Sequence, residues 1–428
     1  MSENKKQQLV PRVRFPEFRD AGEWITVELG KLSRLLTERV GSATCTPYTI
    51  TSGVGLISQE EKLGRTIAGN SLKNYLVLQE NDFAYNKSAT KAYPQGFIAL
   101  YAGGERAAVP NSIFTCFRVN QNQVIPTFLD ALFASNLHGK WLRTRIAVGA
   151  RAHGSLQVSD DDLMATPVPL PNGTNALEEQ QKIADCLSSL DDLIAAETQK
   201  LDTLKTHKKG LMQQLFPREG ETVPRLRFPE FQGAGEWEEK TLDQVSPSIF
   251  DGTHQTPKYA EEGVPFFSVE NIVSGNRNKF ISEEDHIAAT RKNKPEKGDV
   301  LITRIGNIGY STVVHWDYEF SIYVTLAVVK RSPSFNSNFL HGYFQSSRYQ
   351  KELRSKSLLD AVPCKINMEE LRKTEVLVPE IDEQHKIANC LSALDDLIAA
   401  QAQKIELLKR HKKGLMQQLF PVLEDVPA

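Results

Sequence analysis

Two stretches of the chain repeat the same apolar pattern. Apolar side chains recur at alternating steps of four and three residues from position 183 to 215, and again from 387 to 419. Polar residues interrupt the first stretch at Glu197 and Lys208, and the second at Gln401 and Lys412. A repeat sustained over this many turns predicts a long helix with a heptad seam, as in a coiled coil. The predicted seam residues are Ile183, Leu187, Leu190, Ile194, Leu201, Leu204, Leu211, Leu215, Ile387, Leu391, Leu394, Ile398, Ile405, Leu408, Leu415 and Leu419.

The two predicted helices belong to a longer internal duplication. The segment EEQQKIADCLSSLDDLIAAETQKLDTLKTHKKGLMQQLFP at 178–217 reappears as DEQHKIANCLSALDDLIAAQAQKIELLKRHKKGLMQQLFP at 382–421. A second pair of segments, VPRVRFPEFRDAGEW at 10–24 and VPRLRFPEFQGAGEW at 223–237, precedes the two variable regions. The chain therefore consists of two successive halves, each with a signature, a variable region and a long helix.

Each predicted helix needs a partner for its apolar stripe. A rod of about 37 residues is about 55 Å long, which one domain core does not easily enclose. The other copy is the economical partner, and a pseudo-twofold relation makes the pair antiparallel, although sequence alone does not determine the orientation. Gly210 and Gly414 leave a kink or an early stop as the alternative, and Pro217 and Pro421 predict the helix ends. The outer faces, with DDLIAA and HKKG in both copies, predict docking of further subunits or are simply solvated.

The variable regions predict two mixed α/β domains. Residues from about 25 to 170 and from 238 to 379 combine β-branched and aromatic runs such as NYLVL, IFTCFRV and YVTLAVV with turn residues and short helix-like stretches. This pattern predicts a twisted sheet with helices in each region. The predicted organisation is 1–175 for the first signature and domain, 176–217 for the first long helix, 218–379 for the second signature and domain, and 380–428 for the second long helix.

Loops between the predicted strands are rich in side chains that bind phosphates and base edges. Arginine and lysine suit guanine O6/N7 and phosphates, whereas asparagine and glutamine suit adenine N6/N7. Each residue taken singly is weak, because surface loops are ordinarily polar. The candidate DNA-binding residues are Thr51, Ser52, Lys62, Arg65, Asn86, Lys87, Ser88, Lys91, Arg151, His153, His254, Gln255, Thr256, Lys258, Arg277, Asn278, Lys279, Arg304 and Asn307.

Among these candidates, Lys87 and Arg304 occupy the same place in the two halves. An alignment of QENDFAYNKS (79–88) with EKGDVLITRI (296–305) superimposes them, so both halves keep a cation at one position. His153 and His254 have no histidine, cysteine or carboxylate at metal-ligand spacing, and we therefore predict no metal site there.

Composition narrows the class of protein. The 51 lysines and arginines nearly balance 53 acidic residues, which argues against a protein that coats nucleic acid by bulk charge. Five cysteines without a CxxC pair suggest neither a disulfide framework nor a zinc cage. We find no apolar run long enough to span a membrane and no signal-peptide pattern, and we therefore expect a cytoplasmic protein.

Motifs of catalysis are missing. The sequence has no GxxxxGK[ST] phosphate loop, no GxGxxG after a strand, and no Asn/Asp-Pro-Pro-aromatic motif of an amino-methylating DNA methyltransferase. We identify no triad and no magnesium-binding acidic cluster, although such sites are spatial. The sequence therefore predicts no catalytic residue.

The two-half layout, the paired EQxKIA…LDDLIAA…HKKGLMQQLFP helices and the RFPEF…GEW signatures resemble the specificity subunit of type I restriction–modification systems. The likeness covers essentially the whole chain. It implies a cytoplasmic, non-catalytic subunit with two target recognition domains, each reading one part of a split sequence in double-stranded DNA. The helices are then expected to pair, set the gap between the half-sites and dock two methyltransferase subunits, which motor-nuclease subunits join. AdoMet, ATP and magnesium are expected on those partners, and no cofactor on this chain.

Two alternatives remain open at this point. The protein could itself be a methyltransferase or nuclease with fused reading domains, and unaided methylation or cleavage of DNA would show this. It could instead be a coiled-coil scaffold whose variable domains bind proteins, or a decayed specificity subunit. Absence of sequence-dependent protection in the presence of partner subunits would favour that second alternative.

Overall fold

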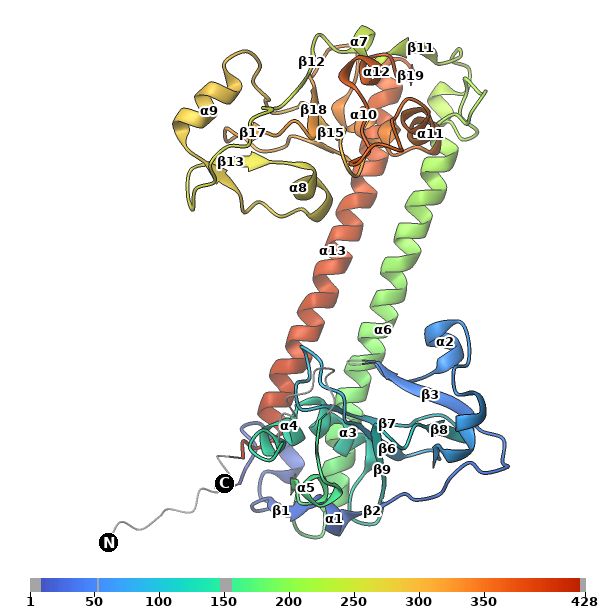
Figure 1. The fold of residues 1–428 in the computed structure, drawn as a ribbon, viewed down its shortest axis with the longest axis vertical. Coiled ribbons are helices and arrows are strands. Elements are labelled where there is room, and N and C mark those ends of the chain that lie inside the picture. Colours follow the sequence, from blue (N-terminus) through green and yellow to red (C-terminus); the bar gives the residue numbers. More distant parts are fainter. Residues whose placement is uncertain (1–8, 52–53, 147–155, 424–428) are drawn as a thin grey trace. The chain divides into compact units, whose positions relative to one another are not determined.

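A computed structural model describes residues 9–51, 54–146 and 156–423 (Figure 1). By contacts the chain divides into two compact units, of which the first contains 1–196 with 404–428 and the second contains 197–403. Neither unit coincides with one half of the duplication, because each contains part of both long helices, α6 (Ala176–Leu215) and α13 (Ile381–Leu419).

The first unit is a mixed α/β domain with three sheets. Its strand orders are β2–β9–β6–β7, β4–β3–β8–β5 and β1–β10, and every pairing is antiparallel except that of β3 with β8. The strands are β1 (Ile25–Glu28), β2 (Ser33–Leu35), β3 (Thr46–Thr51), β4 (Gly55–Ser58), β5 (Leu76–Leu78), β6 (Asp82–Asn86), β7 (Phe97–Leu100), β8 (Ala107–Val109), β9 (Phe114–Val119) and β10 (Pro167–Leu170). The shorter helices are α1 (Leu29–Leu32), α2 (Gln59–Leu63), α3 (Pro126–Ala134), α4 (Leu137–Leu142) and α5 (Asp160–Met164), with 3-10 turns at Pro16–Phe18 and Gly69–Asn74.

The second unit has an arrangement of sheets like that of the first, except that the sheet around β13 has three strands where the sheet around β3 has four. Its strand orders are β12–β18–β15–β16, β14–β13–β17 and β11–β19, and only β13 and β17 pair in parallel. The strands are β11 (Glu238–Thr241), β12 (Ile249–Asp251), β13 (Val264–Phe267), β14 (Phe280–Ile281), β15 (Val300–Thr303), β16 (Ser311–Val313), β17 (Ser321–Ile322), β18 (Leu326–Val329) and β19 (Glu375–Val378). The shorter helices are α7 (Leu242–Val245), α8 (Val269–Ser274), α9 (Glu283–Thr290), α10 (Ser337–Phe344), α11 (Ser347–Ser355) and α12 (Met368–Arg372), with a 3-10 turn at Pro229–Phe231. The predicted mixed α/β fold and its duplication are confirmed.

The central strand β15 shows why its sequence is a continuous apolar run. All four of its residues are buried, because the sheet is covered on both faces. Val300 and Ile302 belong to the core beneath α10, whereas Leu301 belongs to the core around Phe267. Alternate residues of a strand point to opposite faces, so one strand supplies both cores.

The two long helices contain all of the predicted seam residues. Every predicted seam residue is buried or half-buried. Both helices continue through Gly210 and Gly414 and end two residues before Pro217 and Pro421, so neither glycine stops its helix early.

Within each unit the start of one long helix packs beside the end of the other. In the first unit, the core contains Ile183 and Leu187 of α6 together with Leu419 near the end of α13. In the second unit, Ile387 and Leu391 near the start of α13 lie in one core with Leu215 and Phe216. In both units, therefore, the two helices run antiparallel, as the pseudo-twofold relation predicts.

Candidate DNA-recognition surfaces

A buried aspartate anchors the equivalent strand in each half. Asp82 begins β6, is fully buried, and accepts bonds from the Arg118 guanidinium at 2.6 and 2.8 Å. Asp299 directly precedes β15, is also fully buried, and accepts a 2.8 Å bond from the Lys330 ammonium. These charge pairs fix the start of β6 and of β15. These are the strands that Lys87 and Arg304 directly follow.

At the far end of β6, the backbone of Lys87 links two other segments. Its N–H donates to the Ile113 carbonyl at 2.8 Å, and its carbonyl accepts from the Leu156 N–H at 2.7 Å. Its ammonium lies 3.3 Å from an Asp160 carboxylate oxygen, and its side chain is 24% exposed. Lys87 is therefore a half-exposed cation on the edge of the first domain, with a carboxylate that limits its freedom.

Arg304 takes the same backbone position in the second domain. Its N–H donates to the Thr325 carbonyl and its carbonyl accepts from the Ile366 N–H, both at 2.9 Å. The predicted alignment of Lys87 with Arg304 is therefore confirmed at the level of the backbone.

The side chain of Arg304 is buried, unlike that of Lys87. It is 8% exposed and donates to Asp251 Oδ2 at 3.1 Å, to the Val324 carbonyl at 3.0 Å and to the Ile366 carbonyl at 3.3 Å. Burial lowers the pKa of this guanidinium, and the Asp251 carboxylate opposes that shift. Both halves therefore keep a cation at this position, but the charge of Arg304 is buried and ties three segments together. Contact of Arg304 with DNA stays a prediction.

His254 contacts the same carboxylate, that of Asp251. Its Nε2 lies 3.0 Å from Asp251 Oδ2, and its side chain is 73% exposed. Between them, Gly252 is required, because a Cβ there would lie 2.0 Å from the Ile322 carbonyl oxygen. The DGTH segment therefore holds an exposed imidazole in a defined position on a carboxylate that Arg304 also binds.

The other first-domain candidates lie in or after β3, α2 and β6. Lys62 is exposed and donates to the Ile50 carbonyl at 2.8 Å, and the Asn86 side chain accepts from the Ser88 N–H at 3.0 Å. Arg65 and Lys91 are exposed, whereas Thr51 is half-buried. Three candidates, Ser52, Arg151 and His153, lie outside the described residues.

The second domain contains further candidates on two surface segments. The Arg277 guanidinium lies 4.4 Å from the centre of the Trp316 ring and donates to the Tyr318 hydroxyl at 2.7 Å. Lys279 pairs with Glu270 at 2.6 Å, and this hydrogen bond raises the pKa of the lysine. The remaining candidates are exposed: Gln255, Thr256, Lys258, Asn278 and Asn307.

The fold also explains the RFPEF signatures, which sequence reasoning left without a role. Arg14 binds Glu179 at the start of α6 with two bonds of 2.7 Å, and Arg227 binds Glu383 at the start of α13 at 2.8 and 2.6 Å. Both glutamates are 1% exposed. Occurrence of the same arginine and the same glutamate in both copies is the signal that could have suggested these pairs. The signatures therefore fasten the start of each long helix to its unit.

Polar residues at the breaks in the seam form ion pairs between the helices. In the second unit Lys208 binds Asp395 at 2.6 and 2.8 Å, and in the first unit Lys412 binds Asp191 at 2.5 and 2.6 Å. Gln401 donates to a Glu197 carboxylate oxygen at 2.6 Å. The interruptions in the apolar pattern are therefore paired positions, and they agree with an antiparallel register.

One group of side chains in the second unit has metal-ligand chemistry. Ligand atoms of Glu283, His286 and Glu319 all lie within 4.8 Å of one another. His286 Nε2 is 3.1 Å from Glu319, while its Nδ1 is 2.9 Å from the Ser321 hydroxyl. Lys294 already pairs with the other oxygen of Glu319. His286 and Glu319 therefore already have protein partners. Among the described residues, His254 is not part of such a group, and Asp251 is the carboxylate that it contacts.

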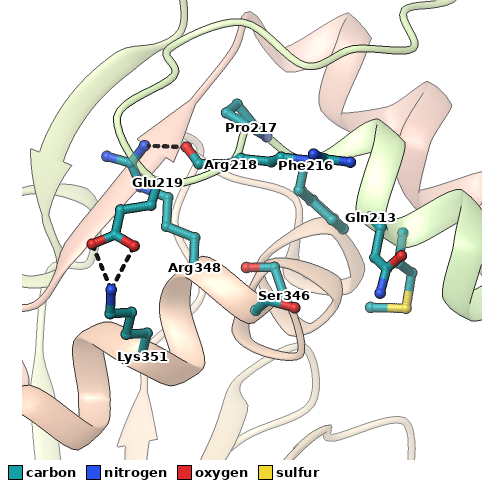
Figure 2. Close-up of a pocket in the computed structure, with 10 residues that line it drawn as sticks. Gln213, Phe216, Pro217, Arg218, Glu219, Ser346, Arg348 and Lys351 are labelled. Carbon is teal, nitrogen blue, oxygen red and sulfur yellow. Dashed lines mark hydrogen bonds and ion pairs between the residues drawn. The ribbon is translucent and has the colours of Figure 1, made fainter.

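A pocket of about 390 Å³ lies where α6 ends against the start of α11 (Figure 2). Figure 2 shows Lys351 directed at both carboxylate oxygens of Glu219, at 2.6 and 2.8 Å, and Arg348 at the Arg218 carbonyl, at 3.0 Å. Phe216 forms part of its apolar lining. Because Lys351 and Arg348 bind groups of the protein, the pocket is not an evident anion site.

Among the described residues, no helix is both long and apolar enough to cross a membrane.

Comparison with known proteins decides the family. A family model described as "Type I restriction modification DNA specificity domain" matches the chain twice, over residues 67–206 and 234–410. The chain belongs to this family. The two matches fall on the two halves of the duplication, which confirms the resemblance and the DNA-recognition function that it implies.

Named relatives and solved structures agree with the family. The putative type I restriction enzyme MjaX specificity subunit of Methanocaldococcus jannaschii is 26% identical over 334 residues, covering 76% of this chain and 74% of that protein. The type I restriction enzyme EcoBI specificity subunit of Escherichia coli is 27% identical over 264 residues, covering 55% and 53%.

Two solved structures share the fold of this chain. The S subunit of a type I restriction–modification system from M. genitalium matches with a TM-score of 0.57 at 14% identity, covering 97% of this chain and 100% of that one. A chain from a study of complex assembly and conformational transition of the type I system matches with a TM-score of 0.56 at 22% identity, covering 93% and 97%. At these identities the likeness shows the fold alone.

Proposed function

We propose that this chain is the non-catalytic specificity subunit of a type I restriction–modification complex, and that its two domains each read one half of a split target in double-stranded DNA. The observation that carries the proposal is a duplicated topology with different loop chemistry. The same strand order presents Lys87 in one domain and a buried Arg304 with an exposed His254 in the other. Two readers of one construction but different side chains suit an asymmetric target.

The long helices are proposed to set the gap between the half-sites and to dock two methyltransferase subunits. Each helix begins with the same buried arginine–glutamate pair, so its position relative to its own domain is defined. Leu193 and Leu397, in the repeated DDLIAA segment, are both exposed. Because the same exposed apolar position occurs twice, it suits a partner that binds in two copies.

The catalytic work is proposed to belong to partner subunits. These are two methyltransferase subunits and the motor-nuclease subunits, with AdoMet, ATP and magnesium bound there and none on this chain. The absence of a phosphate loop and of a methyltransferase motif from the sequence supports this division. We also propose a cytoplasmic location, where the DNA and these subunits would meet.

The proposal is tested by co-expression with a neighbouring-gene methyltransferase subunit in a methylation-free host. Single-molecule sequencing then maps the modified adenines. The expected result is one split motif with a fixed spacer, absent when either protein is omitted. Unmodified DNA in the presence of a stable purified complex would contradict the reading function, and modification by this chain alone would contradict its non-catalytic role.

Exchange of residues 25–170 for the first variable region of another specificity subunit gives a sharper test of modular reading. We expect one half of the mapped motif to change while the other half and the spacer stay the same, because the second domain has its own core and its own loops. The unchanged chain, expressed with the same partner, is the control. Changes in both halves of the motif would exclude independent reading.

A further inference from the structure

One loop of the second domain has unusually exposed apolar side chains. Residues 357–365, here named the apolar loop, connect α11 to α12. Leu358, Leu359 and Val362 are 49%, 57% and 99% exposed. Single exposed apolar residues are normal, but these three lie within five positions of one loop and form a small apolar patch.

The apolar loop is held in place by its backbone. The Leu358 N–H donates to the Lys365 carbonyl at 2.7 Å, and the Lys365 N–H donates back at 3.3 Å, which closes the loop. The Gly306 N–H donates to the Cys364 carbonyl at 2.9 Å, and the Cys364 thiol donates to the Gly306 carbonyl at 2.9 Å. The loop is therefore hydrogen-bonded to the segment after β15. Because it is already ordered, binding costs less conformational entropy.

The same anchor places the apolar loop beside polar reading candidates. Arg304 binds the carbonyl of Ile366, which directly follows the loop, and it binds Asp251, which also contacts the exposed His254. Asn307 follows Gly306 and is exposed. The buried Arg304 thus links the segment that carries the exposed apolar side chains to the segment that carries His254.

We propose that the apolar loop reads base edges in the half-target of the second domain, with Leu359 and Val362 contacting thymine methyl groups in the major groove. This inference rests on the proposed function. The thymine methyl is the apolar group that a base pair presents in that groove, and a carboxylate such as that of the exposed Asp360 suits the cytosine amino group. Lys365, at the end of the loop, can meet a phosphate. DNA is favoured over a protein partner because the patch is small and shares its anchor with His254.

Arg304 acts in this proposal as a positioning residue. Its buried guanidinium binds Asp251 and the Ile366 carbonyl and so holds these two segments at a fixed separation. The expected consequence is that Arg304→Lys, which keeps the charge but not the fork of donors, relaxes the second half of the motif while the first half stays unchanged. A uniform loss of both halves would show a general structural role.

The decisive experiment uses the full chain in complex with the methyltransferase subunit. Leu359→Ser combined with Val362→Ser is compared with Leu359→Met combined with Val362→Ile, which retains apolar surface. We expect the serine variant to bind the mapped target about tenfold more weakly and to accept other bases at one or two positions of the second half only. The Met/Ile variant should keep most of the affinity. Ile287→Ser, at a 61% exposed position on α9, is the matched surface control and should change nothing.

Two results would overturn the inference, and a third would refute the proposed function. Unchanged affinity and an unchanged motif in the serine variant would show that the loop does not touch DNA. Failure of that variant to form the complex would show that the loop contacts a protein subunit. Absence of sequence-specific binding in the unaltered complex would instead refute the proposed function itself, and the two failures are thereby distinguished.

Discussion

The buried charge pairs show how single residues connect the repeated signature to the repeated helix. Arg227 and Glu383 are 156 positions apart, yet they form a two-bonded pair with side chains that are 8% and 1% exposed. Loss of one partner leaves the other as an unpaired buried charge, which costs far more than the pair contributes when intact. The glutamate at the start of each helix is therefore expected to be intolerant of single changes.

Arg227→Met is expected to lower the free energy of unfolding by about 3 kcal/mol, because it leaves the Glu383 carboxylate buried and unpaired. Urea unfolding of the full chain, followed by circular dichroism, measures this change. Lys240→Met is the control, since the Lys240–Glu238 pair is exposed and should contribute less than about 1 kcal/mol. Addition of Glu383→Leu should recover much of the loss, and a double variant as unstable as the single one would contradict the explanation.

A buried histidine makes the first unit sensitive to acid. His138 is fully buried, and burial lowers its pKa from an ordinary value of 6.5 to about 4. Below pH 6.5 the unfolded chain binds a proton here that the folded chain does not, so stability falls as the pH drops from 6.5 toward 4 and is unaffected above that range. Asp130, whose pKa burial raises to about 6, acts in the opposite direction and reduces the net slope.

The contribution of His138 is isolated with His138→Gln, which cannot take up a proton. We expect the difference in unfolding free energy between pH 6.5 and pH 4.5 to be smaller in this variant than in the unaltered chain. Denaturant titrations at the two pH values provide the measurement. Equal pH dependence in both proteins would show that His138 is not the group responsible.

At the scale of the element, both long helices contain a glycine that packing does not require. A Cβ at Gly210 or Gly414 would meet nothing within 4 Å. Glycine in a helix interior is less favourable than alanine by about 1 kcal/mol. These two glycines therefore lower helix stability, although no neighbouring atom of the chain requires the absence of a Cβ.

Gly210→Ala and Gly414→Ala are each expected to raise the free energy of unfolding by about 1 kcal/mol. Gly342→Ala in α10 is the matched opposite case, because its Cβ would lie 3.1 Å from a Leu391 side-chain carbon and 3.3 Å from the Phe216 ring. That variant should be destabilised. Denaturant midpoints of the three variants decide the matter, and a lower midpoint for either long-helix variant would refute the expectation.

At the scale of the whole molecule, the proposal that the long helices set the gap between the half-sites predicts how the spacer of the target depends on helix length. Deletion of residues 196–202 and 400–406 removes one heptad from each helix at equivalent positions. Seven residues are close to two turns, so the apolar faces stay in register while each helix shortens by about 10 Å. We expect the spacer in the methylated motif to shorten by about three base pairs while both half-sites stay the same.

The spacer prediction is checked by mapping modified adenines for the shortened chain expressed with its methyltransferase partner. Deletion of two residues from each helix, which rotates the apolar stripe on either side of the deletion by about 200°, serves as the comparison and should abolish modification. An unchanged spacer in the heptad deletion would show that the helices do not set the gap.

Sequence alone determined the features that depend on neighbours along the chain. The heptad pattern, the repeat and the two prolines predicted both long helices, their partnership and their ends, because side chains three and four positions apart share a helix face. The repeated signatures together with these helices also indicated the family. The antiparallel pairing followed only from the pseudo-twofold relation, and contacts such as Lys412 with Asp191 confirm it.

Tertiary structure alone decided which charged residues reach the surface. Lys87 and Arg304 align in sequence and share a backbone position, yet the first is half-exposed and the second is buried. The difference arises because Asp251, 53 positions away, and the Ile366 carbonyl, 62 positions away, close around the guanidinium. Such partners come from other strands and loops, and no local periodicity encodes them. The exposure of the apolar loop is likewise a property of the folded chain, since an apolar run in sequence ordinarily predicts a core.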